Sequence, residues 1–199
     1  MLTKEEGKQA VQLARTIVET TVKNQSRSSE QKLSEVFYKK HGAFVTLHMA
    51  STHLLRGCIG IPESIMPLEK AIHEAATSVT HDPRFPLLTS DELSDILVEV
   101  TILTPPEQVK VTQPQQYLDQ IKIGRDGLIV EQGFRKGLLL PQVPVEQQWD
   151  KETFLTQTCL KAGLSPDAWF EKETKVFRFT GQIFSENQPY GMIREKKLV

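Results

Sequence analysis

The residues best suited to chemistry lie in the segment Leu55–Gly60, which reads Leu-Arg-Gly-Cys-Ile-Gly. In an extended strand Arg56 and Cys58 share a face, and a guanidinium beside a thiol favours the thiolate, the nucleophilic form of cysteine. Gly57 and Gly60 weaken a strand, so their presence implies that a ligand or another chain segment approaches the backbone closely. Their N–H groups could then hold an oxyanion or a phosphate oxygen. The alternative is structural, because free cysteines are often buried and glycines often permit a bulge.

The segment His81–Pro86 brings together an imidazole, a carboxylate and a guanidinium, and its prolines restrict φ. If this segment packs on the strand that carries Cys58, His81 can act as the base for the thiol, with Asp82 orienting its ring. Arg84 is then a further candidate for binding an anionic group. The alternative is that Asp82 and Arg84 only cap the preceding helix and pair with each other.

Two later segments carry polar groups that could line a binding site. Gly124–Gly127 could hold an anion through its N–H groups with Arg125 beside them, although Asp-Gly is also the common signal of a tight hairpin turn. Gln142 and Glu146 follow an apolar stretch and would either line a cleft or only satisfy loop backbone. The histidines and the two cysteines lack the spacing of metal ligands, so we predict no tightly bound metal and no cofactor.

Composition narrows the class of protein. The 199 residues carry 24 Lys+Arg against 25 Asp+Glu, a formal net charge of -1, so no whole-molecule field favours nucleic acid or an anionic membrane. Hydrophobic residues make up 39%, enough for one core or for two small lobes without a disulfide. The N-terminus is charged, and no stretch approaches the ~18 apolar residues of a membrane span. We therefore expect a cytoplasmic protein with no membrane contact, for which nucleic acid is a poor candidate partner.

Apolar periodicity predicts the elements that must position these residues. Helices are expected over 4–23, from 67 to before 83 and from 150 to 163, and strands over 43–49, 54–61, 96–103, 128–130, 138–140 and 176–184. Residues 24–31 are typical of a surface loop. Helices and strands do not alternate one for one, which favours a largely antiparallel α+β fold with sheets flanked by helices. We expect one domain over 1–186, built of two lobes packed closely together, and a flexible tail over 187–199.

Several segments in order resemble the AMMECR family, named for the Alport syndrome, midface hypoplasia and elliptocytosis chromosomal region. The resemblance runs from His41 to Phe184 through Gly42–Leu47, Leu55–Gly60, Asp82–Pro86, Gly124–Leu128, Leu139–Val143 and Cys159–Leu164. It implies a two-lobed α+β fold with the Arg-Gly-Cys segment at a cleft. Microbial members are similar to proteins that occur with Memo-like and radical SAM proteins, which implies a shared modification pathway and partners of those kinds. Two departures, Leu87 where a second proline often follows Pro86 and Pro144 where a small residue is common, could reshape the edge of that cleft.

Two hypotheses follow for the function. In the first, a small anionic molecule binds at Leu55–Gly60 and Cys58 is a nucleophile that Arg56 keeps ionised, while His81 and Asp82 handle protons. In the second, the protein is a non-catalytic regulatory module that docks a partner protein or nucleic acid through the same cleft, and Cys58 only fills space in the packing. The resemblance supplies no substrate, so both hypotheses stay open at this point.

Overall fold

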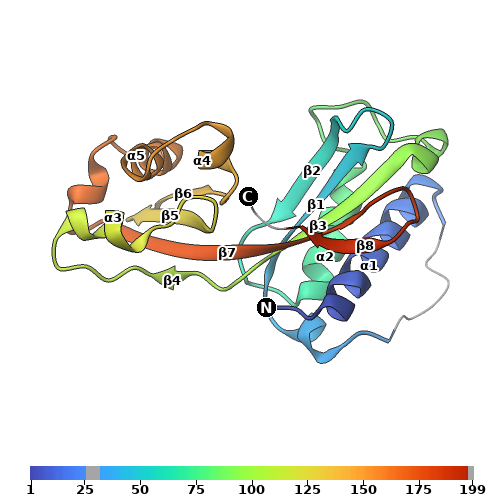
Figure 1. Ribbon diagram of the computed structural model, residues 1–199, viewed down its shortest axis with the longest axis horizontal. Helices are drawn as coiled ribbons and strands as arrows, with labels where there is room; N and C mark the ends of the chain where they lie inside the picture. Colours follow the sequence, from blue (N-terminus) through green and yellow to red (C-terminus); the bar gives the residue numbers. More distant parts are fainter. Residues whose placement is uncertain (26–31, 197–199) are drawn as a thin grey trace. The chain divides into compact units, whose positions relative to one another are not determined.

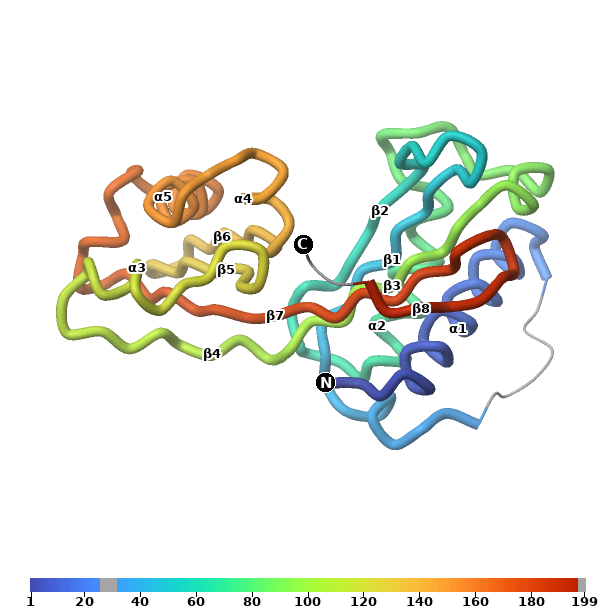
Figure 2. Tube along the Cα trace, in the orientation of Figure 1, coloured from blue at the N-terminus to red at the C-terminus, as the bar shows by residue number. Residues whose placement is uncertain are grey.

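The computed structural model describes residues 1–25 and 32–196, and the chain folds into two compact units, which can be followed in Figure 2. The first unit comprises Met1–Pro105 together with residues 182–196, and the second comprises Pro106–Gly181. Each unit has its own hydrophobic core. Most of the predicted loop 24–31, and residues 197–199 of the predicted tail, lie outside the described residues.

In the first unit a sheet carries two helices on one face (Figure 1). Across the sheet the strands follow the order β2 (Leu55–Ile61), β1 (Gly42–Met49), β3 (Ile96–Leu103) and the end of β7 (Lys175–Glu186), which also pairs with β8 (Ile193–Lys196). The helices are α1 (Lys4–Val22) and α2 (Leu68–Val79), and the 3-10 turns are η1 (Glu35–Tyr38) and η2 (Ser90–Asp95). The pairings of β1 with β2 and β3 are antiparallel, and β2 is an outer strand.

The local sequence explains why α1 begins where it does. Thr3 and Glu6 form the predicted capping box: Thr3 Oγ1 accepts the Glu6 N–H at 3.2 Å, and the Glu6 carboxylate accepts the Thr3 N–H at 2.7 Å. The apolar stripes of α1 and α2 then pack with Val45 of β1 and Val98 of β3 in one buried cluster. The helices therefore cover one face of the sheet and leave the alternate strand residues on the other.

The second unit is built in the same style from shorter elements. Its strands are β4 (Glu107–Gln108), β5 (Asp126–Gln132), β6 (Arg135–Leu139) and the first part of β7, and its helices are α3 (Tyr117–Gln120), α4 (Val143–Glu146) and α5 (Lys151–Lys161), with 3-10 turns η3 (Pro114–Gln116) and η4 (Ala168–Phe170). Asp150 caps α5 as predicted, since its Oδ1 accepts the Thr153 N–H at 2.8 Å. Gly163 has a φ of 71° and closes the helix in the left-handed conformation that the sequence predicts.

The predicted α+β class with antiparallel sheets is confirmed, and the main difference lies near the C-terminus. The sequence predicts a flexible tail from residue 187, but residues 193–196 form β8. This strand forms because it pairs with β7, with Ile183 opposite Lys196, and because Ile193 packs against the first core. Among the described residues, no helix is long and apolar enough to cross a lipid bilayer.

Candidate functional site

Cys58 lies on the outer strand of the first unit, on the sheet face opposite the helices. The missing side chain of Gly57 faces Val79 of α2, so Cys58, the next residue of β2, points to the other face. Thr46 is its partner across the strand pair, and Thr46 Oγ1 donates a hydrogen bond to Cys58 Sγ at 3.3 Å. The thiol is half-buried and is held by the neighbouring strand.

Both glycines of this strand make room for other parts of the chain. A Cβ at Gly57 would lie 3.0 Å from Val79 Cγ2 and 3.1 Å from the Val79 carbonyl oxygen, so the glycine lets the end of α2 approach β2. A Cβ at Gly60 would lie 2.2 Å from the Phe44 ring, which crosses the strand there. The sequence predicted that either a ligand or another chain segment approaches these glycines closely. The approach of another chain segment accounts for both positions. Ligand binding by Gly57 and Gly60 stays a prediction.

Asp82 and Arg84, which we call the edge bracket, cover the outer edge of β2 at Cys58. Asp82 is buried, and its Oδ2 accepts the Cys58 N–H at 2.9 Å. Arg84 Nη2 donates to the Cys58 carbonyl oxygen at 2.9 Å and to Asp82 Oδ2 at 2.7 Å, while Arg84 Nε donates to Asp82 Oδ1 at 3.0 Å. The bracket therefore satisfies both backbone groups of Cys58 as a further strand would.

The same contacts set the charge of the buried carboxylate. Hydrogen bonds from Arg84, and then from the Cys58 N–H, hold the pKa of Asp82 far below its usual range, against the opposing effect of burial. Asp82 is therefore an anion at all physiological pH values. The sequence analysis gave two roles for Asp82: pairing with Arg84, or handling protons for the thiol. The structure shows the pairing with Arg84. The proton-handling role stays a prediction.

The structure does not bring Arg56 and His81 together on the thiol. Arg56 donates from Nε and Nη2 to the two carboxylate oxygens of Glu92, at 2.7 and 3.1 Å, and from Nη2 to the Leu87 carbonyl oxygen at 3.3 Å. His81 is exposed, and its Nδ1 lies 2.7 Å from Thr80 Oγ1. Arg56 therefore fixes the segment before β3, and the guanidinium that acts on the thiol belongs to Arg84.

The surroundings of Cys58 favour the neutral thiol. Burial raises its pKa above the ordinary value, and the hydrogen bond from Thr46 and the charge of Arg84 offset this only in part. The expectation that Arg56 keeps Cys58 ionised is therefore not met, because the pKa moves in the opposite direction and Arg56 is engaged by Glu92. At neutral pH the thiol is protonated.

Alkylation of Cys58 by iodoacetamide is expected to be slower at pH 7.5 than that of an unhindered cysteine, with a pH midpoint above the free value of about 8.5. Thr46→Val should raise the midpoint further, because it removes the hydrogen bond that lowers the pKa. Peptide mass spectrometry separates Cys58 from Cys159, whose pKa is raised to about 11 by burial. A midpoint near or below pH 7 would contradict the neutral thiol and restore the nucleophile hypothesis.

The other predicted positions lie in the second unit. The N–H groups of Arg125 and Asp126 both donate to the Lys122 carbonyl oxygen, at 3.2 and 3.0 Å, so they form a turn and not the anion cradle that was the alternative. Gln142 precedes α4, and its buried Oε1 accepts no hydrogen bond from the residues that the structure describes. Glu146 ends α4 and is exposed. Their roles as ligand-binding residues stay predictions.

Two residues that contact the predicted site residues were not predicted from the sequence: Glu92, which binds Arg56, and Thr46, which donates to Cys58. Only Glu92 could have been found from the sequence. Thr89 and Glu92 have the spacing of a capping box, and Glu92 does accept the Thr89 N–H at 2.9 Å while it binds Arg56. Thr46 left no such signal, because the register of the hairpin decides which residue of β1 faces Cys58.

Comparison with known proteins agrees with the resemblance seen in the sequence. A family model described as AMMECR1 matches residues 11–184. Protein MJ0810 of Methanocaldococcus jannaschii is 54% identical over 200 residues, which cover 100% of this chain and 99% of that protein. A protein of Pyrococcus abyssi is 48% identical, with 97% of this chain and 96% of that protein covered. The crystal structure of the uncharacterised protein PH0010 from Pyrococcus horikoshii matches with a TM-score of 0.85 at 44% identity, over 99% of both chains. The chain therefore belongs to the AMMECR1 family.

Proposed function

We propose that the first unit binds a small anionic molecule, without forming a covalent bond, at Arg84 beside Cys58. The observation that carries this proposal is an arginine that is fixed and yet exposed: 56% of the Arg84 side chain is accessible, although its guanidinium is held by the buried Asp82. Exposed arginines usually move freely, and ordering one on binding lowers the affinity. A fixed one has lost that freedom already.

The geometry of Arg84 leaves one side of its guanidinium available. Nε and Nη2 bind Asp82 and the Cys58 carbonyl oxygen, and the guanidinium carbon lies 5.6 Å from the centre of the Phe85 ring. Nη1 makes no hydrogen bond to any residue that the structure describes. A carboxylate or a phosphate is the class of group that an arginine in this state recognises best.

In this proposal Cys58 is an uncharged thiol that contacts the ligand and does not react with it. A protonated thiol can contact a ligand and donate a weak hydrogen bond, but a nucleophile needs a base to remove its proton. Both oxygens of Asp82 are engaged by the edge bracket, and no hydrogen bond between described residues joins His81 to the thiol. Enzymatic activity, and Memo-like or radical SAM proteins as partners, stay predictions from the resemblance.

The test is calorimetric titration of the protein with phosphate, pyrophosphate and citrate. Arg84→Lys keeps a positive charge beside Asp82 but loses the planar fork, and we expect it to weaken binding by about 10-fold, the worth of one charged hydrogen bond. Arg125→Lys is the matched control, because Arg125 is also exposed and is also held by an adjacent buried carboxylate, that of Asp126. It should leave the affinity unchanged.

The two variants make the proposal refutable. Equal losses at Arg84 and Arg125 would show that the anions bind any exposed arginine, and the absence of saturable binding by all three anions would also overturn the proposal. Thermal unfolding of each variant shows whether it is folded in the titration. Cys58→Ser should change the affinity little, because the thiol carries no charge.

A further inference from the structure

We propose that copies of this protein associate head to tail, with the tip of the β5–β6 hairpin of one copy entering a groove between α1 and β8 of the next. The proposal concerns surfaces distant in sequence from Cys58 and does not depend on anion binding at Arg84. It starts from two surface features that the folding of a single copy does not require. One is an exposed aromatic side chain, and the other is an apolar groove with a charged rim.

The aromatic side chain is that of Phe134. Only Gly133 and Phe134 separate β5 from β6, so Phe134 stands at the tip of the hairpin, where its side chain is fully exposed. The tip borders a hollow of about 520 Å³ that Glu171 and Glu173 also line. Turns favour glycine, asparagine or aspartate, so phenylalanine has no advantage there for folding, and Phe134 is the most exposed large apolar residue among those that the structure describes. The tip therefore offers an aromatic ring beside two carboxylates.

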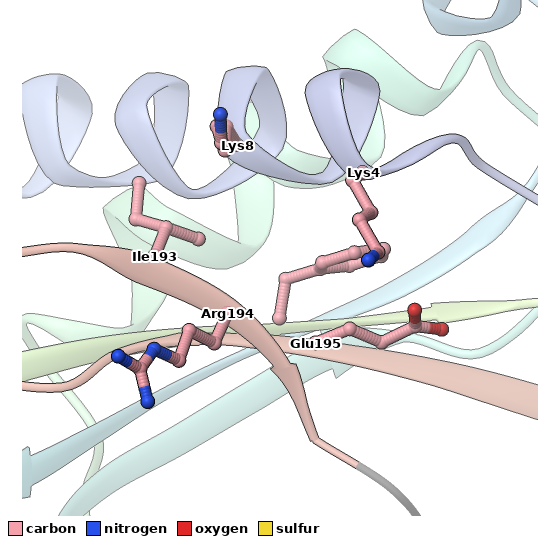
Figure 3. A pocket seen from close by; sticks show the side chains of 6 residues that line it. Lys4, Lys8, Ile193, Arg194 and Glu195 are labelled. Carbon is pink, nitrogen blue, oxygen red and sulfur yellow. The ribbon is translucent and has the colours of Figure 1, made fainter.

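The groove lies between α1 and β8 and has a volume of about 470 Å³ (Figure 3). Phe184 and Ile193 form its apolar floor, and Figure 3 shows the Ile193 side chain directed toward α1. The helix lies close to β7 at Gly7, where a Cβ would be 2.2 Å from the Phe184 ring. This volume falls in the range of pockets that enclose whole ligands, so one phenyl ring fits with room for its flanking backbone.

The charges at the rim of the groove complement those at the tip. Lys4, Lys8 and Arg194 line the groove, and Figure 3 shows Lys8 and Arg194 on its two sides. Lys8 is paired with Glu5 at 3.1 Å, but Lys4 and Arg194 form no ion pair with any described residue. The acid in the rim, Glu195, accepts a hydrogen bond from Gln182 at 3.0 Å.

On the tip, Glu171 accepts a hydrogen bond from Gln132 at 2.7 Å, and Glu173 has no ion pair with the residues that the structure describes. The hollow also has one cation, Arg135, whose Nη1 donates to the Gly163 carbonyl oxygen at 2.9 Å and which could meet Glu195 of the groove. Two carboxylates thus meet three cations around a buried ring. Since both halves of this contact occur on one chain, a second copy is the occupant that the observations favour.

The contact joins two different surfaces, and contacts of this kind build either closed rings or open chains. A copy that has inserted its tip still has an empty groove, and association can continue beyond the dimer. The contact area of a single tip is small, which predicts weak and concentration-dependent association. A net charge of -1 leaves no strong overall repulsion between copies.

Sedimentation equilibrium of the full chain from low concentration to about 1 mM tests the proposal, because contacts of this size have dissociation constants near the millimolar range. The weight-average mass of the wild type should rise by at least about 1.5-fold at the top of the series. Phe134→Ser, and separately the double variant Lys4→Glu with Lys8→Glu, should each remain monomeric. Leu160→Ser, which changes an exposed apolar residue elsewhere in the second unit, should behave as the wild type.

A mixture of the two defective variants gives the sharpest result. Phe134→Ser retains the groove and the lysine double variant retains the tip, so together they should form a complex that stops at one to one. A wild type that is monomeric throughout the series, or a Phe134→Ser variant that associates as the wild type does, would overturn the proposal. A mixture that forms no one-to-one complex would also overturn the proposal. Two defective variants can restore the contact only if it joins two different surfaces, each intact in one of the variants.

Discussion

Arg15→Ala is expected to destabilise the first unit by about 3–5 kcal/mol, the usual effect of breaking a buried ion pair from one side. Arg15 is buried, and it binds both carboxylate oxygens of the buried Glu186, through Nε at 3.1 Å and through Nη2. It also donates to the carbonyl oxygens of Leu93 and Ile96, at 3.3 and 2.6 Å. Alanine leaves the Glu186 carboxylate in the interior without its counter-ion, although the Val98 N–H still donates to it at 2.9 Å. It also removes a hydrogen-bond donor from the Leu93 and Ile96 carbonyl oxygens.

The measurement is hydrogen exchange of the α1 amides in increasing denaturant, which follows the first unit directly. Both tryptophans, Trp149 and Trp169, belong to the second unit, so their fluorescence follows that unit by itself. Lys8→Ala is the control, because the pair of Lys8 with Glu5 lies on the exposed face of α1 itself, and its loss should be below about 1 kcal/mol. Exchange of α1 that is as slow in Arg15→Ala as in the wild type would refute the prediction.

The fold could be predicted from sequence where the determining interactions are local. The capping box at Thr3, the left-handed Gly163 and the alternation of β1 and β2 each involve residues a few positions apart, and each element forms within a few residues of its predicted bounds. β8 was missed because a strand of four residues has almost no pattern of its own. It exists through its pairing with β7.

The residues of the site could be predicted from the sequence, but the contacts between them could not. Cys58, Asp82 and Arg84 were all identified from residue type, yet the sequence paired the thiol with Arg56. The correct partner depends on where α2 ends relative to β2, and that position is set by the fit of Val79 against Gly57, far along the chain. Residue types are local information, whereas the choice between two arginines is decided by tertiary packing.

Asp82→Asn is expected to lower the free energy of unfolding of the first unit by about 2–4 kcal/mol at pH 7. The carboxylate accepts hydrogen bonds from the Cys58 N–H and from the backbone and side chain of Arg84, and it is buried. An amide group has one acceptor oxygen in place of two, so part of the edge bracket loses its partner. Hydrogen exchange of the first unit in urea measures the loss, and thermal unfolding gives an independent value.

The pH dependence of this loss identifies its origin. Because the pKa of Asp82 is lowered in the folded chain, its stabilisation is complete above the unfolded-state pKa of about 3.9 and is lost as the pH falls toward the folded value. The difference between wild type and Asp82→Asn should therefore be constant from pH 7 down to about 5 and should shrink below about pH 4. If the variant instead matches the wild type in stability at pH 7 and differs only in the alkylation of Cys58, the carboxylate acts on the thiol and not on the strand edge. The proton-handling role predicted from the sequence would then be the better explanation of why an aspartate stands beside that cysteine.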